Sequence, residues 1–166
     1  MIARLFHYLI LLPISLLPFK ILYFLSDILY LILYYIINYR KEIISKNIDN
    51  SFPELNGKQK THLIKQFYKH LSDIMVESVK SFTITKKQLY KRSTITNHEI
   101  IDAYAAKNRS VIIVGGHYNN WEMFAQATPL YHKHKCLGIY KELSNKFYNS
   151  KMLKSRQQFG FSMYSM

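Results

Sequence analysis

The chain has 166 residues, enough for one globular domain of ordinary size with a core that needs no disulfides. Its only cysteine, Cys136, excludes a disulfide framework inside the chain and favours a reducing compartment. The 23 lysines and arginines outnumber the 10 aspartates and glutamates, for a formal net charge of +13, which predicts an anionic partner such as nucleic acid, phospholipid headgroups or a phosphorylated substrate.

The N-terminal segment is strongly apolar. Residues 5–37 contain only two formal charges, Lys20 and Asp27. Residues 21–37 approach the roughly 20 residues that a helix needs to cross a hydrocarbon core of about 30 Å. We therefore expect residues 1–38 to form a hydrophobic membrane anchor.

Two prolines, Pro13 and Pro18, interrupt this apolar run. The part before them is expected to lie in the membrane interface or to form a second, kinked helix. A cleaved signal peptide does not fit, because the apolar region is too long and no small-residue cleavage site follows it. A buried helical hairpin in a soluble core is the alternative, since placing Asp27 in lipid is costly.

Basic residues set the expected orientation. Arg40, Lys41 and Lys46 follow the apolar segment directly, whereas only Arg4 and Lys20 lie before or within it. The positive-inside rule then places the rest of the chain in the cytoplasm.

After the apolar segment, the pattern is that of a water-soluble domain. Apolar residues at helical spacing predict one long helix over residues 57–82, with Asn56 as its N-cap. Thr96 and Glu99 form a capping-box pattern, which predicts a short helix that ends near Asn108.

Strands and helices then alternate along the chain. Residues 110–114 form a short β-branched run, typical of a strand covered on both faces. Helix 121–129, strand 136–140 and helix 144–159 are expected to follow, and a third strand begins near the end of the sequence. This order predicts an α/β fold, in which an N-terminal hydrophobic membrane helix precedes a helix-flanked, mainly parallel sheet with right-handed crossovers.

Polar residues gather where the first predicted strand ends. Residues 115–122 read Gly-Gly-His-Tyr-Asn-Asn-Trp-Glu, and the ligands of an open parallel sheet collect at the carboxyl ends of its strands. The two glycines allow a tight turn and a close backbone approach. His117 is placed to take a proton from an alcohol, while Glu122 can orient the imidazole and stabilise the imidazolium.

Each candidate residue has a structural alternative. His117 could be a satisfied structural histidine, and Glu122 could serve only the positive end of the following helix. Asn120 could be the N-cap of that helix, and Arg156 a solvated charge rather than a clamp for a phosphate or carboxylate. No H-E-x-x-H motif or cysteine cluster supplies further zinc ligands, so no metal is expected.

The string GHYNNWE resembles the G-H-F-G-N-W-E form of the H-x-x-x-x-[DE] motif in the bacterial lipid A late acyltransferases, the lauroyl and myristoyl transferases of the glycerolipid acyltransferase superfamily. Other elements appear in that family's order after the apolar N-terminus. Residues 47–54 resemble its N…F-P-E element, residues 140–145 its tyrosine-basic element, and residues 156–160 its R-x-x-[FL]-G element.

This resemblance implies a membrane-bound O-acyltransferase. The enzyme would move a fatty acyl chain from acyl carrier protein to a hydroxyl of an anionic lipid acceptor, a lipid A precursor, without a metal or redox cofactor. His117 and Glu122 are then the catalytic residues, and the substrate-binding residues are Asn120, Arg156 and Lys141.

The chain departs from the family's pattern in two positions and in length. Asn119 stands where the family has glycine, a change that asparagine tolerates in a left-handed conformation. Glu142 stands where the family has proline, so the loop after the second strand is expected to be less rigid. Family members are longer, and the resemblance therefore implies that residues 39–166 are the N-terminal part of the catalytic domain, with an incomplete sheet.

Three alternatives remain open at this point. The same base could serve a lysophospholipid or aminolipid acceptor, or the chain could be an inactive fragment. It could instead be a basic, membrane-anchored protein that binds nucleic acid. However, it contains no helix-turn-helix, zinc-finger or RNP motif, and anionic lipid already accounts for the charge. We therefore expect no nucleic-acid partner.

Overall fold

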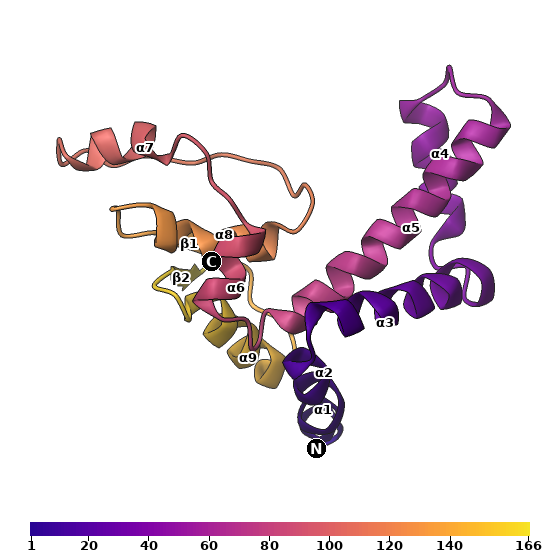
Figure 1. The fold of residues 1–166 in the computed structure, drawn as a ribbon, viewed down its shortest axis with the longest axis horizontal. Coiled ribbons are helices and arrows are strands. Elements are labelled where there is room, and N and C mark those ends of the chain that lie inside the picture. The colour runs from indigo at the N-terminus through magenta and orange to yellow at the C-terminus, as the bar shows by residue number, and fades with distance from the viewer. The chain divides into compact units, whose positions relative to one another are not determined.

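The computed structural model describes residues 1–166, which divide into two compact units (Figure 1). One unit comprises Met1–Leu16 and Ser78–Met166; we call it the motif unit because it contains His117. The other comprises Leu17–Glu77 and contains helices but no strand; we call it the helical unit. Helix α5, Gly57–Lys80, begins in the helical unit and ends in the motif unit.

The helical unit is built from three helices around one apolar core. Helix α3, Phe19–Leu31, continues directly into the π-helical turn η2, Ile32–Ile36, and α4, Lys41–Ser51, precedes α5. The buried side chains of this core come from η2, α4 and α5; they are Leu33, Ile44, Ile48 and Tyr68.

The predicted long helix is confirmed as α5, which ends two residues before the expected residue 82. Its predicted N-cap is also confirmed. The Asn56 side-chain oxygen accepts from the Gln59 amide at 3.0 Å, and the Gln59 side chain accepts from the Asn56 amide at 2.9 Å. Helix α4 had no predicted counterpart, because its buried pair Ile44 and Ile48 covers only one helical turn.

One helix has the length and apolar composition to cross a membrane. It covers Phe19–Ile36, which is 18 residues, and begins two residues before the expected span. Only 17% of this stretch is buried, unlike the core helix of a soluble protein. A shorter apolar helix covers Ile2–Leu16. The prediction of an N-terminal hydrophobic helix is therefore confirmed in length and composition.

The first apolar segment forms one helix rather than a broken one. Helix α1 (Ile2–Phe6), the π-helical turn η1 (His7–Leu11) and α2 (Leu12–Leu16) follow one another directly. Pro13 lies inside α2 and does not end the helix. The turn before it is the wider π form, in which the Leu12 amide reaches the His7 carbonyl, so the helix passes the missing proline N–H.

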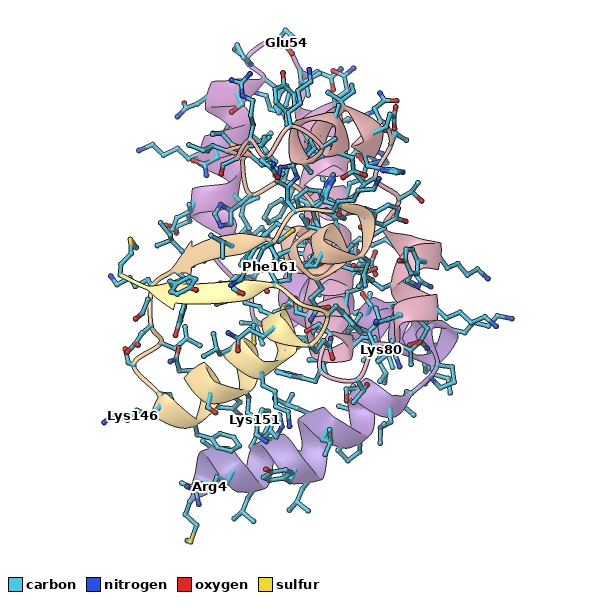
Figure 2. All side chains as sticks on the ribbon, turned by 90° about the vertical axis from the view of Figure 1, so that its left-hand side faces the viewer. Arg4, Glu54, Lys80, Lys146, Lys151 and Phe161 are labelled. Atoms are coloured by element: carbon cyan, nitrogen blue, oxygen red, sulfur yellow. The ribbon has the colours of Figure 1, made fainter.

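The C-terminal end of α2 is capped from within the motif unit. The Lys80 side chain is labelled in Figure 2. Its Nζ, at 2.9 Å, and Thr83 Oγ1, at 2.5 Å, both donate to the carbonyl of Ser15. A cation is favourable at this end, where carbonyl groups have no partner inside the helix. Burial lowers the pKa of Lys80.

The C-terminal part of the motif unit forms a β–α–β arrangement. Strand β1 (Leu137–Tyr140) is joined by α9 (Lys146–Gln157) to β2 (Ser162–Ser165), and the two strands pair in parallel with Leu137 opposite Ser162. Helix α8 (Trp121–Tyr131) precedes β1 and passes Pro129. The α/β prediction is confirmed, as are the strand and the helix expected over residues 136–140 and 144–159.

The strand predicted over residues 110–114 is not formed. The only sheet contains β1 and β2, and neither strand pairs with this segment. Its β-branched side chains are exposed, with Ile112 and Val114 each 89% accessible. A strand needs a hydrogen-bonded neighbour, so the apolar pattern alone could not produce one here.

Two further helices precede this segment. Helix α6 (Lys86–Arg92) begins with a capping box between Thr85 and Gln88, which the sequence analysis missed. Helix α7 (His98–Ala105) confirms the predicted short helix, but the Thr96 capping box is wrong. The N-cap is Asn97, in a left-handed conformation and without a side-chain cap.

Helix α7 is fastened to the segment after α8 through Asp102. The carboxylate accepts from the Lys133 amide at 3.0 Å and lies 3.5 Å from His98 Nδ1 and 3.8 Å from His132 Nδ1. Nearby, His134 Nε2 lies 2.9 Å from the carbonyl of Arg109. The Lys133 amide, aided by the two imidazoles, holds the pKa of Asp102 below its ordinary value of 3.8.

We expect the contacts of the Asp102 carboxylate to weaken in acid. Because the pKa of Asp102 is lower in the folded chain than in the unfolded chain, its contribution is complete above the ordinary pKa and is lost as the pH falls through the lowered one. Asp102→Asn should therefore speed amide hydrogen exchange in α7 at neutral pH. Glu99→Gln, on the same helix and exposed, is the control and should leave exchange unchanged. Equal exchange in the Asp102 variant and the parent chain would contradict the assignment.

Candidate active site

The loop of residues 109–120 carries the His117 motif between α7 and α8. Asn119 has a φ of 54°, so the position occupied by glycine in the family's pattern is left-handed, a conformation that asparagine tolerates. Gly115 and Gly116 have open space around them and no positive φ. The chain reversal before α8 therefore depends on Asn119 and not on the two glycines.

His117 lies exposed on this loop, against the first residue of α8. Its imidazole meets the Trp121 ring edge to face, with 4.8 Å between the ring centroids. The expected contact between His117 and the carboxylate of Glu122 is not formed; both carboxylate oxygens accept hydrogen bonds from another residue instead. The candidate base is thus accessible from solvent and adjoins an aromatic ring.

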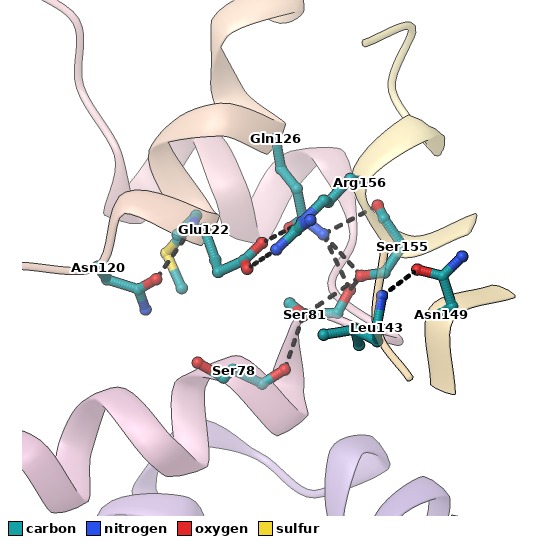
Figure 3. Close-up of polar contacts among 10 residues, drawn as sticks. Ser78, Ser81, Asn120, Glu122, Gln126, Leu143, Asn149, Ser155 and Arg156 are labelled. Carbon is teal, nitrogen blue, oxygen red and sulfur yellow. Dashed lines mark hydrogen bonds and ion pairs between the residues drawn. The ribbon is translucent and has the colours of Figure 1, made fainter. Parts of the chain in front are cut away.

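The partner of Glu122 is Arg156, which comes from the last turn of α9 (Figure 3). Arg156 Nε donates to one carboxylate oxygen at 2.8 Å, and Nη2 donates to the other. The guanidinium also lies over the Trp121 ring, 5.2 Å from its centroid. Two sequence-predicted site residues are therefore brought together, and Trp121 links their pair to His117.

Electrostatics favour this pair. The side chains of Arg156 and Glu122 are only 16% and 12% exposed, so the attraction is less screened than on the surface. The hydrogen bond to the Glu122 carboxylate raises the pKa of Arg156 above its ordinary value, although burial opposes the shift. The guanidinium is therefore held charged at neutral pH.

A buried polar network lies beside the pair, and the sequence analysis missed it. The Gln126 side-chain amide donates to Ser155 Oγ at 2.8 Å and to the Ser155 carbonyl at 2.9 Å, and Ser155 Oγ donates to the Ser81 carbonyl at 3.0 Å (Figure 3). Gln126 follows Glu122 by four residues and so shares its helix face. This four-residue spacing was the sequence signal that could have identified Gln126 as part of the site. The network joins α8, α9 and the end of α5.

Asn120 and Lys141 have different surroundings. The Asn120 side chain accepts from the Met123 amide at 3.0 Å, which makes it the N-cap of α8. Lys141 is exposed directly after β1, and its side chain forms no ion pair. The loop that follows is tied to α9 by the Leu143 amide, which donates to Asn149 at 3.0 Å.

Positive charge is concentrated in the unit that contains these residues. The motif unit has 15 lysines and arginines against 4 aspartates and glutamates, whereas the helical unit has 8 against 6. An anionic ligand is therefore expected to favour the motif unit. In residues 1–166, no group of three or more His, Cys, Asp or Glu side chains has an arrangement that could hold a metal ion.

Comparison with known proteins identifies the family. The family model described as bacterial lipid A biosynthesis acyltransferase matches residues 2–166, which is nearly the whole chain. No curated protein and no solved structure matches it. The family match covers both the apolar N-terminus and the His117 motif. The chain therefore belongs to the bacterial lipid A biosynthesis acyltransferase family, a family of acyltransferases.

Proposed function

We propose that the protein is a membrane-bound O-acyltransferase that uses an acyl thioester on acyl carrier protein and acylates a hydroxyl of a lipid A precursor. The observation that carries this proposal is the family match over residues 2–166, which includes an exposed histidine in the loop before α8. The high positive charge of the motif unit suits an acidic carrier protein and a phosphorylated acceptor.

His117 acts as the general base in this mechanism. Its neutral imidazole takes the proton of the acceptor hydroxyl while the oxygen attacks the thioester carbonyl. The C–S bond then breaks, and the imidazolium returns the proton to the departing thiolate. The products are an ester and a free thiol, so atoms and charge balance without an enzyme nucleophile. Donors beside the carbonyl stabilise the transient oxyanion.

Glu122 supports this base after a rearrangement of the loop. When the acceptor binds, His117 leaves the Trp121 edge and approaches the carboxylate, which orients the ring and stabilises its cation. Arg156 holds that carboxylate in place through two of its nitrogens. The remaining nitrogen, Nη1, is left to bind a phosphate or carboxylate of the substrate. Asn120 and Lys141 complete the substrate site as an amide donor and a mobile cation.

The membrane part of the proposal rests on the N-terminus. Residues 1–38 serve as the anchor, and residues 39–166 carry the catalytic motif on the cytoplasmic side of the inner membrane. This functional division differs from the two compact units, because α1 to α2 pack in the motif unit while carrying exposed apolar residues such as Leu9 and Leu16.

Lipid analysis tests the proposed acceptor. The protein is produced in a bacterium that lacks one of its own late lipid A acyltransferases, and lipid A is measured by mass spectrometry. We expect the unsubstituted protein to restore the mass of one ester-linked acyl group in lipid A, and His117→Ala not to restore it. A gain of acylated phospholipid or aminolipid with unchanged lipid A would instead support the alternative acceptor.

A further inference from the structure

The helix formed by α3 and η2 has two different faces. On one face, Leu22, Ser26 and Leu33 are buried within the helical unit. On the other, exposed apolar side chains recur at intervals of three or four residues: Ile21, Phe24, Ile28, Leu31 and Tyr35. At 3.6 residues per turn, these five positions form one line along the helix, which we call the exposed stripe.

Polar groups join the buried face to α5. The Ser26 hydroxyl donates to Asp73 at 2.6 Å, and the Tyr23 hydroxyl donates to Glu77 at 2.5 Å. Both bonds link a position on α3 to an acidic side chain of α5. The apolar helix is thus bound to a charged helix at its N-terminal half.

The contacts continue toward the C-terminal half. Lys69 pairs with Asp27 at 3.6 Å, and the Tyr34 ring meets the Tyr68 ring at 5.3 Å between centroids. The partners on α5 run from Glu77 back to Tyr68 as α3 runs forward, so the two helices are antiparallel. Where they adjoin, α5 contains five ionisable side chains: Lys65, Lys69, His70, Asp73 and Glu77.

These contacts conflict with a helix that crosses the bilayer. If α3 and η2 spanned the hydrocarbon core, α5 would enter it as well, together with its five ionisable groups. Charged groups are costly in hydrocarbon, and Lys69 and His70 are exposed rather than shielded by protein. A helix that lies along one leaflet avoids this cost. Its stripe faces the acyl chains while α5 remains in water.

We propose that the helix Phe19–Ile36 lies in one leaflet of an anionic bilayer, with the exposed stripe in the lipid and α5 on the water side. This inference rests on the proposed attachment of the protein to a membrane. It places both ends of the helix on the same side, so the chain is held by an interfacial helix rather than by a transmembrane one.

Charge complementarity indicates that the exposed stripe binds an anionic lipid surface. Cations flank the helix at both ends, Lys20 in its first turn and Arg40 and Lys41 after its last. None of them forms an ion pair within the chain. Lysine and arginine at both ends suit two contacts with headgroup phosphates on one surface, and would suit opposite sides of a membrane less well.

Cysteine labelling tests the topology. In a Cys136→Ser background, Lys20→Cys and Glu42→Cys mark the two ends of the helix. A maleimide that does not cross membranes is added to intact spheroplasts and to inside-out vesicles. We expect both positions to react only in the inside-out vesicles. Reaction of the two positions in opposite preparations would establish a spanning helix and overturn the proposal.

A second pair of positions measures depth. His70→Cys, on the exposed side of α5, should react readily in the inside-out vesicles, whereas Ile28→Cys, in the stripe, should react in neither preparation. Protection of His70→Cys would place α5 in lipid, and ready reaction of Ile28→Cys would place the stripe in water. Either result contradicts the proposal.

Spin labelling separates lipid from a covering protein. A nitroxide attached at Ile28→Cys should collide with oxygen, which dissolves in lipid, and not with a water-soluble nickel chelate. Exclusion of both agents would mean that a second protein copy covers the stripe, which overturns the proposal. His117→Ala serves as the control for function, because it should lower acyl transfer by about 10² to 10⁴-fold and leave every labelling result unchanged.

Discussion

His117→Ala is expected to lower turnover by about 10² to 10⁴-fold, the usual contribution of a general base. The side chain lies exposed on a loop and packs edge to face with the Trp121 ring, so its loss should not disturb the fold. Acyl transfer from acyl carrier protein, measured on the purified protein in lipid, gives the rate. Thermal unfolding of the same sample reports on the fold.

A matched variant tests whether the effect is specific. His70→Ala removes another exposed histidine, from α5, and should retain the activity of the parent chain. Trp121→Phe keeps an aromatic ring beside His117 and should cause a smaller loss than His117→Ala. If His117→Ala turned over at the parental rate, His117 would have no part in the chemistry.

The sequence predicted long, strongly patterned elements well. Residues 57–82 and 144–159 have apolar positions or caps that define a helix locally, and α5 and α9 follow them closely. The left-handed Asn119 was also predictable, because asparagine tolerates this conformation and the related pattern has glycine there. These features depend on residues close together in the chain.

Features that depend on distant residues were not predictable in the same way. The run 110–114 has the composition of a strand, but a strand also requires a neighbour, and β1 pairs only with β2. Likewise, a proline in the sequence indicates a break, and only the backbone reveals that a π-helical turn carries the helix past Pro13. The local sequence pattern favours a helix or a strand, and contacts with distant residues determine whether it forms.

In the candidate site, too, local features were predictable and contacts between distant residues were not. His117 and Glu122 were identified from one short motif, and Arg156 from a separate one 34 residues away. The sequence placed Glu122 beside His117, the nearer partner along the chain. In the fold, the β–α–β crossover returns α9 to the start of α8, where a guanidinium offers two hydrogen bonds to a carboxylate and an imidazole offers at most one. The bidentate pair therefore forms.

Breaking the pair between Glu122 and Arg156 is expected to affect both stability and catalysis. Removal of one partner leaves the other charge poorly exposed and unpaired, which costs about 3 kcal/mol for a buried pair. Glu122→Gln and Arg156→Gln should each lower the unfolding temperature. The double variant should lose less than the sum of the two, because the interaction is lost only once. Strict additivity would contradict a direct pair.

Turnover of the same variants separates a structural carboxylate from a catalytic one. Arg156→Gln retains the Glu122 carboxylate, so at saturating acceptor and at a temperature where both proteins are folded it should keep a higher turnover than Glu122→Gln. If the carboxylate stabilises the His117 cation, adding Glu122→Gln to His117→Ala should cost little beyond His117→Ala alone, since residues that act as a unit are not additive. If Glu122 had a purely structural role, turnover would follow the unfolding temperature in all variants. The losses of turnover from Glu122→Gln and from His117→Ala would then multiply in the double variant.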